Sequence, residues 1–406
     1  MTDSAMDILE NSPLSKPRMM GTHGEKDTIN YITNFLTQNS LQPQKEEIIW
    51  SNGLVRGRKV MEVFIGLFMV FFTISLYLEP PYNGYLPIAG IIGFLGFMVV
   101  FVTLLTKDKF EFLGKKAKGY NIIATVGKDR ILTSEDENLK KEIFLTAHYD
   151  TVASSMPKFG KISIAGKALS LLFTLLLTLT TGILFLIRFY THSLKLETTI
   201  VILRWIILGL TTFSLILIFI SFFSKRTNDS DGACDNGSGS AVLLDLAAFF
   251  GKNPLKNVNL TFIWCAAEEW GLYGSKAYVK RHKEELMAMK DRFYNINVDM
   301  VGQEIAYMEK KGVFKTTPLN KTLNKLIKES AEEKEIEVRG FKSMMAGSSD
   351  HAPFKKIKLE VATFLSKKDV KKIHCDQDTL DIVNPEKMAG AVELIKRVIQ
   401  KLDKKA

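Results

Sequence analysis

Five short segments of this 406-residue chain carry histidine and carboxylate side chains of the kind that bind divalent metals. They are Ala147-His-Tyr-Asp150, Ala233-Cys-Asp-Asn-Gly237, Ala267-Glu-Glu-Trp-Gly271, Asn297-Val-Asp-Met-Val-Gly302 and Ile373-His-Cys-Asp-Gln-Asp-Thr379. Imidazole nitrogen and carboxylate oxygen are the ligands expected of zinc or a neighbouring divalent ion. A carboxylate that bridges two ions would hold them about 3.5–4 Å apart, the separation of co-catalytic sites. Together the segments indicate metal-assisted chemistry.

The adjacent pair Glu268 and Glu269 strengthens this interpretation. A pair of glutamates usually lies on a solvated face, and a single histidine at a strand end is more often structural than a ligand. Here, however, the pair follows Leu260–Ala267, an apolar run that must be buried. Two carboxylates at the end of a buried strand are costly without a cation or a proton as partner. Adjacent strand residues point in opposite directions, so we expect the two side chains to take separate roles.

The order and spacing of these segments resemble the zinc aminopeptidases of metallopeptidase family twenty-eight (clan MH). The resemblance begins at Arg18-Met-Met-Gly-Thr-His-Gly24, runs through Gly119-Tyr-Asn-Ile-Ile-Ala124 and ends past Asp378-Thr-Leu-Asp381. It implies a zinc-exopeptidase-type α/β/α sandwich around a mixed sheet. It also implies two zinc ions per chain and the release of N-terminal residues from peptide substrates.

The resemblance further implies a ligand set. Asp235 resembles the carboxylate that bridges the two metals. His148 and Asp299 would complete the ligands of one metal, and Glu269 and His374 those of the other. Zinc is the metal implied, although cobalt and manganese suit the same donors.

The same resemblance implies two catalytic roles. Glu268 resembles the general base that takes a proton from the attacking water and passes it to the leaving amine. Asp150 resembles the carboxylate that orients His148 and raises its basicity as a ligand. A bound divalent ion lowers the pKa of its water towards about 7, so hydroxide is available at neutral pH.

Other candidate side chains are set aside. His351, in Ser348-Ser-Asp-His-Ala352, is interpreted as a residue of the pocket or of its surroundings, because the family's metal histidine comes later and precedes an Asp-Thr pair. Cys234 and Cys375 neighbour ligands but are interpreted as small packing residues. The remaining histidines have no partner motif and receive no role: His23, His192 and His282.

Two apolar runs of membrane-spanning length separate His148 from Asp235, and two more precede them. A span needs about 17–25 residues, which is met by Val60–Leu78, Leu86–Thr106, Ala168–Ile187 and Thr198–Phe223. Buried helices of a soluble protein would show a polar face at helical spacing, and these runs show none. We therefore expect two transmembrane hairpins, at 58–106 and 162–225. They interrupt a peptidase domain made of 1–57, 107–161 and 226–406.

Charge predicts the side on which the peptidase domain lies. Only Arg188 and Lys195 fall in the short loops between paired spans, whereas thirteen basic residues flank the spans on the other side: Arg56, Arg58, Lys59, Lys107, Lys109, Lys115, Lys116, Lys118, Lys158, Lys161, Lys167, Lys225 and Arg226. This positive-inside bias predicts a multi-pass protein of the cell membrane with a cytosolic catalytic domain.

The bulk composition agrees with a cytosolic domain at a bilayer. The net charge of +10 suits anionic lipid, and no nucleic-acid-binding motif is present. Three cysteines without a pairing pattern argue against a disulfide scaffold and fit a reducing compartment. The polar N-terminus, Met1–Met20, does not resemble a secretory signal. Oligomeric state is left open by the sequence.

Outside the hairpins, strand and helix patterns alternate, which predicts helices around a buried sheet. We expect every candidate site residue to fall where a strand ends. The predicted strands are Glu46–Trp50, Tyr120–Val126, Glu142–Ala147, Val258–Cys265, Phe293–Val301 and Val361–Phe364, and the predicted helices are Glu25–Gln38, Gly239–Phe250, Gly271–Lys290, Leu319–Glu333 and Pro385–Leu402.

Three other functions compete with the aminopeptidase. A glutaminyl-cyclase-like acyltransferase shares the fold but uses one zinc, so the additional pair His148 and Asp299 favours the hydrolase. A non-catalytic membrane binding or scaffold protein would have lost ligands, and here none is missing. A transporter would need charges along its spans, where only Glu62 and Arg204 occur.

Overall fold

The computed structural model describes residues 4–106, 109–127, 140–192, 194–312, 315–344 and 349–404. The chain forms two compact units, each assembled from separated segments. We call the first the sheet unit; it comprises Met1–Trp50, Ala117–Ala153 and Arg226–Ala406. We call the second the helical unit; it comprises Ser51–Lys116 and Ser154–Lys225. Each unit is described by itself below.

A mixed sheet forms the centre of the sheet unit, as predicted. Its strand order is β1-β2-β6-β3-β7-β11-β8-β10, with β9 paired to β8. The strands are β1 Gln44–Ser51, β2 Lys116–Val126, β3 Lys141–His148, β6 Val258–Cys265, β7 Phe293–Val298, β8 Ala306–Lys311, β9 Thr317–Pro318, β10 Arg339–Ser343 and β11 Glu360–Phe364. The four central strands, β6, β3, β7 and β11, run parallel, so their carboxyl ends share one edge. On either side of them, β2 and β8 are antiparallel to their neighbours β6 and β11.

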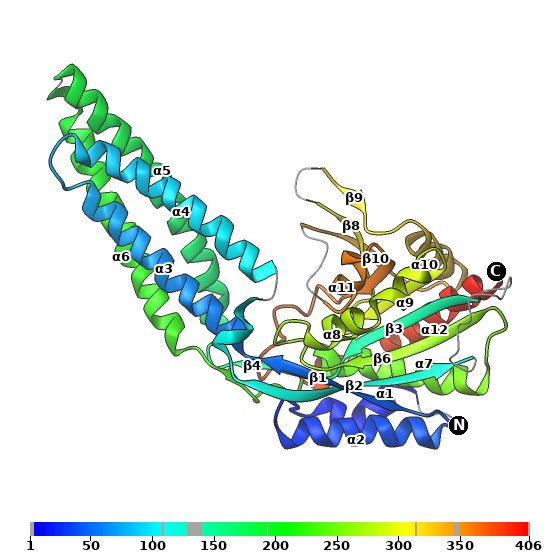
Figure 1. Cartoon of the computed structure of the whole chain (residues 1–406). Coiled ribbons are helices and arrows are strands. Elements are labelled where there is room, and N and C mark those ends of the chain that lie inside the picture. Colours follow the sequence, from blue (N-terminus) through cyan, green and yellow to red (C-terminus); the bar gives the residue numbers. More distant parts are fainter. Residues whose placement is uncertain are drawn as a thin grey trace. The chain divides into compact units, whose positions relative to one another are not determined.

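Helices cover both faces of this sheet (Figure 1). The helices are α1 Ala5–Glu10, α2 His23–Gln38, α7 Gly239–Lys252, α8 Tyr273–Arg281, α9 Lys283–Ala288, α10 Thr322–Glu333, α11 His351–Lys356 and α12 Pro385–Lys404. Alternation along β6 shows how the two faces are filled. Trp264 donates its indole N–H to the Ser240 carbonyl of α7, whereas Ile263 and Cys265 join the core beneath α8, α9 and α11. The result is the α/β/α sandwich expected from the sequence.

Several predicted elements differ from the structure. The single helix expected over Gly271–Lys290 is two helices, α8 and α9, which break at His282. The imidazole of His282 contacts Glu46 and Glu285 there. Strands β8 and β10 were not predicted. Neither shows the alternation that marks a half-buried strand, because the buried residues of β8 are consecutive, Ala306–Met308, and only Phe341 in β10 is both apolar and buried.

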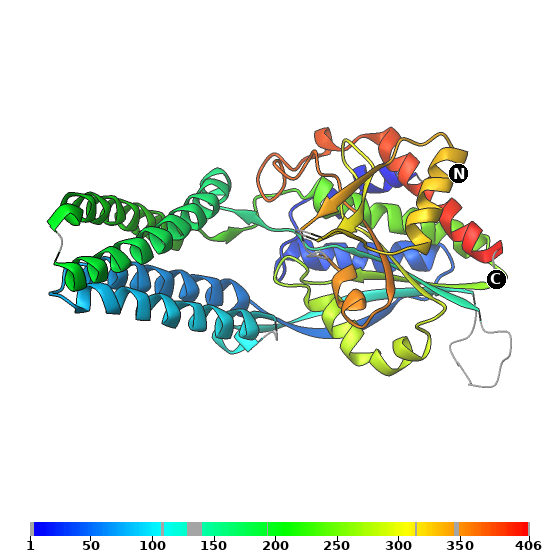
Figure 2. The same ribbon diagram turned by 90° about the horizontal axis from the view of Figure 1, so that it is seen from above.

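The helical unit is a bundle of four helices that run side by side in both views (Figures 1 and 2). They are α3 Gly53–Ser75, α4 Tyr82–Thr106, α5 Pro157–Thr191 and α6 Glu197–Phe223. Hydroxyls link the helices inside the bundle, with Thr73 to Thr211 at 2.8 Å and Ser214 to Ser170 at 2.7 Å. Many large apolar side chains of these helices face outward. Such a surface is unusual in water and ordinary in lipid.

Three helical stretches of the described residues are long and apolar enough to cross a membrane: Tyr82–Leu104, Ile162–Thr191 and Leu194–Phe223. They are compatible with membrane association. The predicted count of four spans is not confirmed. Helix α3 carries Arg58, Lys59 and Glu62 near its start and ends at Ser75, so its uncharged part is too short to cross a membrane by itself. Of the flanking basic residues, Lys107 lies outside the described residues.

Candidate metal centre

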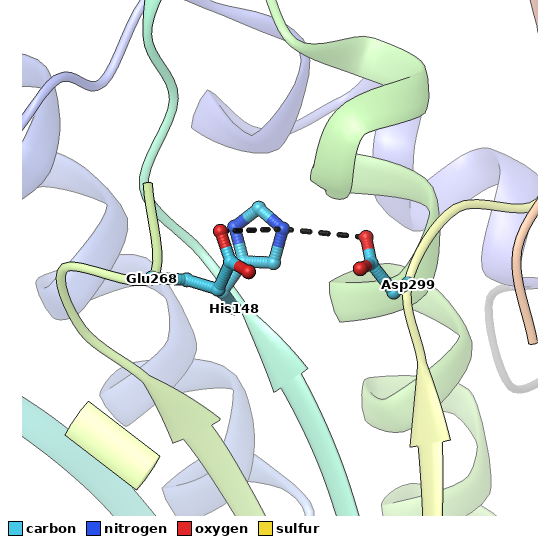
Figure 3. Close-up of side chains that lie close together, drawn as sticks. All are labelled: His148, Glu268 and Asp299. Carbon is cyan, nitrogen blue, oxygen red and sulfur yellow. Dashed lines mark ion pairs between the residues drawn. The ribbon is translucent and has the colours of Figure 1, made fainter. Parts of the chain in front are cut away.

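The first ligand group is assembled at the shared edge of the parallel strands. His148 is the last residue of β3, where its register partner is Cys265, the last residue of β6. Asp299 directly follows β7, and Glu268 stands on the turn beyond β6. Both carboxylates approach the same nitrogen of the His148 imidazole (Figure 3). Its Nε2 is 3.5 Å from Asp299 Oδ1 and 4.0 Å from Glu268 Oε2.

A second group consists of Asp235, Glu269 and His374. His374 Nε2 lies 2.8 Å from Glu269 Oε1 and 3.1 Å from Asp235 Oδ2. The other oxygen of Asp235, Oδ1, lies 3.2 Å from His148 Nε2. One carboxylate thus offers one oxygen to each group, which is the arrangement that a bridging ligand requires.

Asp235 and His374 do not lie where strands end, so that expectation is wrong for these two residues. Asp235 belongs to the Ala233–Ser238 turn in front of α7, and His374 lies in a loop with a positive φ of 60°. The sheet edge alone therefore does not build the centre. Two irregular segments bring in the remaining ligands: the Ala233–Ser238 turn, which follows the second insertion, and the loop that carries His374.

The Glu268–Glu269 pair lies on a tight turn and not on the strand. β6 ends at Cys265, and Ala267 and Leu272 take positive φ values of 54° and 60°. The N–H groups of Glu268 and Glu269 donate to the two carboxylate oxygens of Asp150, at 3.0 and 3.3 Å. The divergence of the two glutamates therefore comes from this turn, and the strand alternation proposed from the sequence is not its cause.

Asp150 makes a different contact from the one expected. The Nδ1 atom of His148 is 3.1 Å from the backbone oxygen of Asp150 and 3.7 Å from its carboxylate oxygen. The nearer partner of the ring is thus the main chain. The fully buried carboxylate instead holds the turn that presents Glu268 and Glu269.

Sequence reasoning gave no role to two residues that hold the Asp235 segment. Asp378 accepts the N–H groups of Cys234 and Asp235, at 2.7 and 3.2 Å. The fully buried Arg18 donates to the backbone oxygens of Tyr149, Asp231 and Gly232. Both residues stand inside the motifs that carry the family resemblance. The signal available was that a buried arginine or aspartate needs several partners to offset its desolvation.

Gly232 allows the Asp235 segment to approach Thr151, just after β3, closely. Its φ is 58°, and a Cβ atom there would lie 2.1 Å from Thr151 Cγ2 and 2.7 Å from the Asp235 backbone oxygen. Only glycine takes this position without moving the bridging ligand.

The pKa shifts of the side chains at the centre show which added charge it favours. Burial works against protonation of His148, yet Glu268 and the hydrogen-bonded carboxylates raise its pKa well above the usual value. Glu269, opposed by burial, raises the pKa of His374 to about 11. Burial raises the pKa of Glu268 well above its ordinary range. The cluster therefore favours added positive charge.

These residues fit a divalent cation. In the described part of the chain, the four carboxylates of Asp235, Glu268, Glu269 and Asp299 form ion pairs only with the two histidines. Nitrogen and carboxylate oxygen are the donors that zinc prefers. The His148 side chain is 2% exposed and that of His374 44% exposed, so the centre opens to solvent on the His374 side.

The residues set aside from the sequence lie outside both groups. His351 is buried at the first position of α11, and Ser348 lies outside the described residues. Cys234, Cys265 and Cys375 are free and buried. Burial raises the pKa of the Cys234 thiol well above its usual value, which agrees with a packing role. His23 pairs with the exposed Asp27 and His282 with the mostly buried Glu46, neither of which belongs to the two ligand groups.

Comparison with known proteins places these observations in a family context. Residues 217–399 match the model of Peptidase family M28. Aminopeptidase YwaD of Bacillus subtilis (strain 168) is 30% identical over 197 residues, which cover 47% of this chain and 42% of that protein. The chain thus spans less than half the length of the curated relatives that it matches.

Solved structures share the fold at low identity. The aminopeptidase from Aneurinibacillus sp. strain AM-1 is 15% identical with a TM-score of 0.52, covering 98% of this chain and 92% of that one. The glutaminyl cyclase of Porphyromonas gingivalis is 14% identical with a TM-score of 0.51, covering 99% and 98%. Since both kinds of enzyme have this fold, the fold alone does not choose between them.

Proposed function

Because residues 217–399 match the model of Peptidase family M28, we propose that the chain is a membrane-anchored, zinc-dependent aminopeptidase of this family that removes N-terminal residues from peptides. The observation that carries the proposal is the pair of ligand groups that share Asp235. A one-zinc cyclase needs a single group, whereas two groups with a common carboxylate suit a co-catalytic pair of ions.

In this proposal His148, Asp235 and Asp299 hold one zinc ion, and Asp235, Glu269 and His374 hold the other. Bound zinc supplies a Lewis acid for the scissile carbonyl and makes water acidic enough to attack at neutral pH. Glu268 is left free as the proton carrier, although its position beside His148 would also allow it to be a ligand.

Glu268 is suited to move a proton. Its carboxylate is mostly buried, with 11% of the side chain exposed, and burial raises its pKa. A carboxyl group with a raised pKa is a stronger base than usual, which suits accepting a proton from the attacking water before returning it to the leaving amine. The hydrogen bonds from the turn N–H groups to Asp150 keep the Glu268 backbone in place during both transfers.

Three apolar helices support the membrane part of the proposal. Since Asp235 lies only nine residues past Arg226, the last basic residue that flanks the spans, the centre would work close to the bilayer surface, on the cytosolic side by the positive-inside bias. If so, the chain stays with membranes under alkaline carbonate extraction, and a tag at the C-terminus is cleaved by protease only after cytosolic access is given. Release by carbonate would contradict the anchoring.

The activity is tested with the full chain in detergent micelles. We expect two zinc ions per chain by elemental analysis, and release of free amino acids from unblocked peptides but not from N-acetylated ones. Glu268→Gln should keep the zinc and lower kcat by about 10²- to 10⁴-fold. Glu284→Gln, an exposed glutamate of α9, is the matched control and should behave as the parent protein.

Two outcomes would redirect the proposal. Release of ammonia from N-terminal glutaminyl peptides, with no free amino acid, would assign the chain to the cyclase chemistry. Full zinc occupancy without turnover on any unblocked peptide would instead favour a binding protein built on this fold.

A further inference from the structure

Trp270, the residue after Glu269, is held between two side chains from distant parts of the sheet unit. Its ring centroid lies 5.0 Å from that of Trp50, and the Arg226 guanidinium lies 4.9 Å from the same ring. The guanidinium also donates to the backbone oxygen of Glu269 at 2.6 Å. Both tryptophans are 8% exposed. The turn that carries Glu269 thus has a second support, independent of Asp150.

The positions of the two supporting residues in the chain are informative. Trp50 is the last residue of the sheet unit before the first insertion, and Arg226 is the first residue after the second insertion. The residues at which the chain enters the first hairpin and leaves the second, Trp50 and Arg226, therefore both contact Trp270.

The contacts are of kinds that resist displacement. A guanidinium bonded to a carbonyl is a charge-assisted hydrogen bond, and tryptophan is the aromatic ring that attracts a cation most strongly. The indole N–H groups of Trp50 and Trp270 are buried and have no hydrogen-bond partner among the described residues. The tilted ring contact with Trp50 and the cation–π contact with Arg226 therefore hold Trp270, and among the described residues no hydrogen bond of its ring would replace Arg226.

We propose that Arg226 and Trp50 form a clamp on Trp270 that positions Glu269 as a metal ligand and so couples the roots of both hairpins to the metal centre. The proposal deepens the proposed function, because it rests on Glu269 being a ligand. Arg226 is a positioning residue in this scheme. Displacement of either hairpin root would loosen the turn and weaken zinc at the Glu269 and His374 group.

The test measures zinc affinity of the full chain in nanodiscs by competition with a chelating indicator, together with hydrogen exchange of the turn amides. Arg226→Ala should weaken binding of one zinc ion about 10- to 100-fold, the usual effect of removing a group that supports a ligand. Exchange should quicken at Gly271 and Leu272, whose N–H groups donate to the Glu268 oxygen. Lys225→Ala, a change at the exposed neighbour, should alter neither quantity.

Unchanged zinc affinity and exchange in Arg226→Ala would overturn the clamp. A fall in turnover alone would do the same, since it would assign Arg226 to substrate binding. If Arg226→Ala does not fold, the variants Arg226→Lys and Trp50→Phe test the proposal instead. Each keeps part of the contact and should lower the zinc affinity several-fold. An affinity equal to that of the parent protein in both variants would refute the proposal. A zinc effect without any peptidase activity would leave the clamp standing and remove only the proposed function.

Discussion

The contact of Asp150 with the ligand turn leads to a prediction that separates two roles for this residue. In the structure its carboxylate accepts two backbone N–H groups, from Glu268 and Glu269, while His148 is nearer to its backbone oxygen. Asp150→Asn leaves that backbone oxygen in place. It keeps one acceptor oxygen and turns an amide N–H₂ towards the other donor. The variant therefore tests the turn without removing the nearest partner of the imidazole.

The magnitude follows from the lost bond. A hydrogen bond to a charged group contributes about 1.5–3 kcal/mol, and each 1.4 kcal/mol corresponds to a factor of ten. Loss of one such bond should thus weaken the zinc ion held by Glu269 about 10- to 100-fold. Asp291→Asn, an exposed aspartate just before β7, is the matched control and should bind zinc as the parent protein does.

The assay is zinc competition against a chelating indicator, with elemental analysis at saturation. The double variant His374→Ala, Asp150→Asn shows whether Asp150 supports the turn or His148. The His148 group keeps its own ligands in His374→Ala, so adding Asp150→Asn should change the remaining zinc affinity little. A large additional loss in that background would mean that the carboxylate supports His148 after all. Zinc affinity within about twofold of the parent in the single variant would refute the turn argument altogether.

Three further predictions follow from other contacts. Gly232→Ala should lower the melting temperature and the zinc content together, because its Cβ would meet Thr151 Cγ2 at 2.1 Å and displace the Asp235 segment. Calorimetry measures the first quantity and elemental analysis the second. A variant that behaves as the parent protein would contradict the close approach at Gly232. Chelator treatment should lower the melting temperature reversibly, with zinc restoring it, since a cation bound only by the folded chain stabilises it and relieves repulsion among four carboxylates; an unchanged melting curve would argue against a metal centre. The hydrogen bond with Glu46 raises the pKa of His282 above 6.5, so the stabilisation that this pair gives the folded chain is complete below pH 6.5 and is lost as the pH rises through the folded-state pKa. In thermal melts, His282→Gln should therefore lower the stability by about 1 kcal/mol or less at pH 6 and by little at pH 9. A difference that does not depend on pH would exclude this ion pair as the cause.

The elements with strong periodicity and the identity of the candidate ligands could be predicted from the sequence. The apolar runs at Val258–Cys265 and Gly239–Phe250 could hardly form anything other than a buried strand and a buried helix, and the structure has β6 and α7 there. The placement of His148 and Asp299 at one edge also followed, because parallel strands bring their carboxyl ends together.

Tertiary structure decided what depends on contacts between distant segments. The turn under Glu268 and Glu269 is held by Asp150 and Arg226, which precede their partners by 118 and 43 residues, and no local pattern encodes such partners. The same holds for Arg18 and Asp378, which fix the Asp235 segment from the two ends of the chain. The types of ligand are thus set by local sequence, whereas their exact positions are set by buried hydrogen bonds, because an unpaired polar group in the interior is costly and each must find a partner wherever the fold brings one.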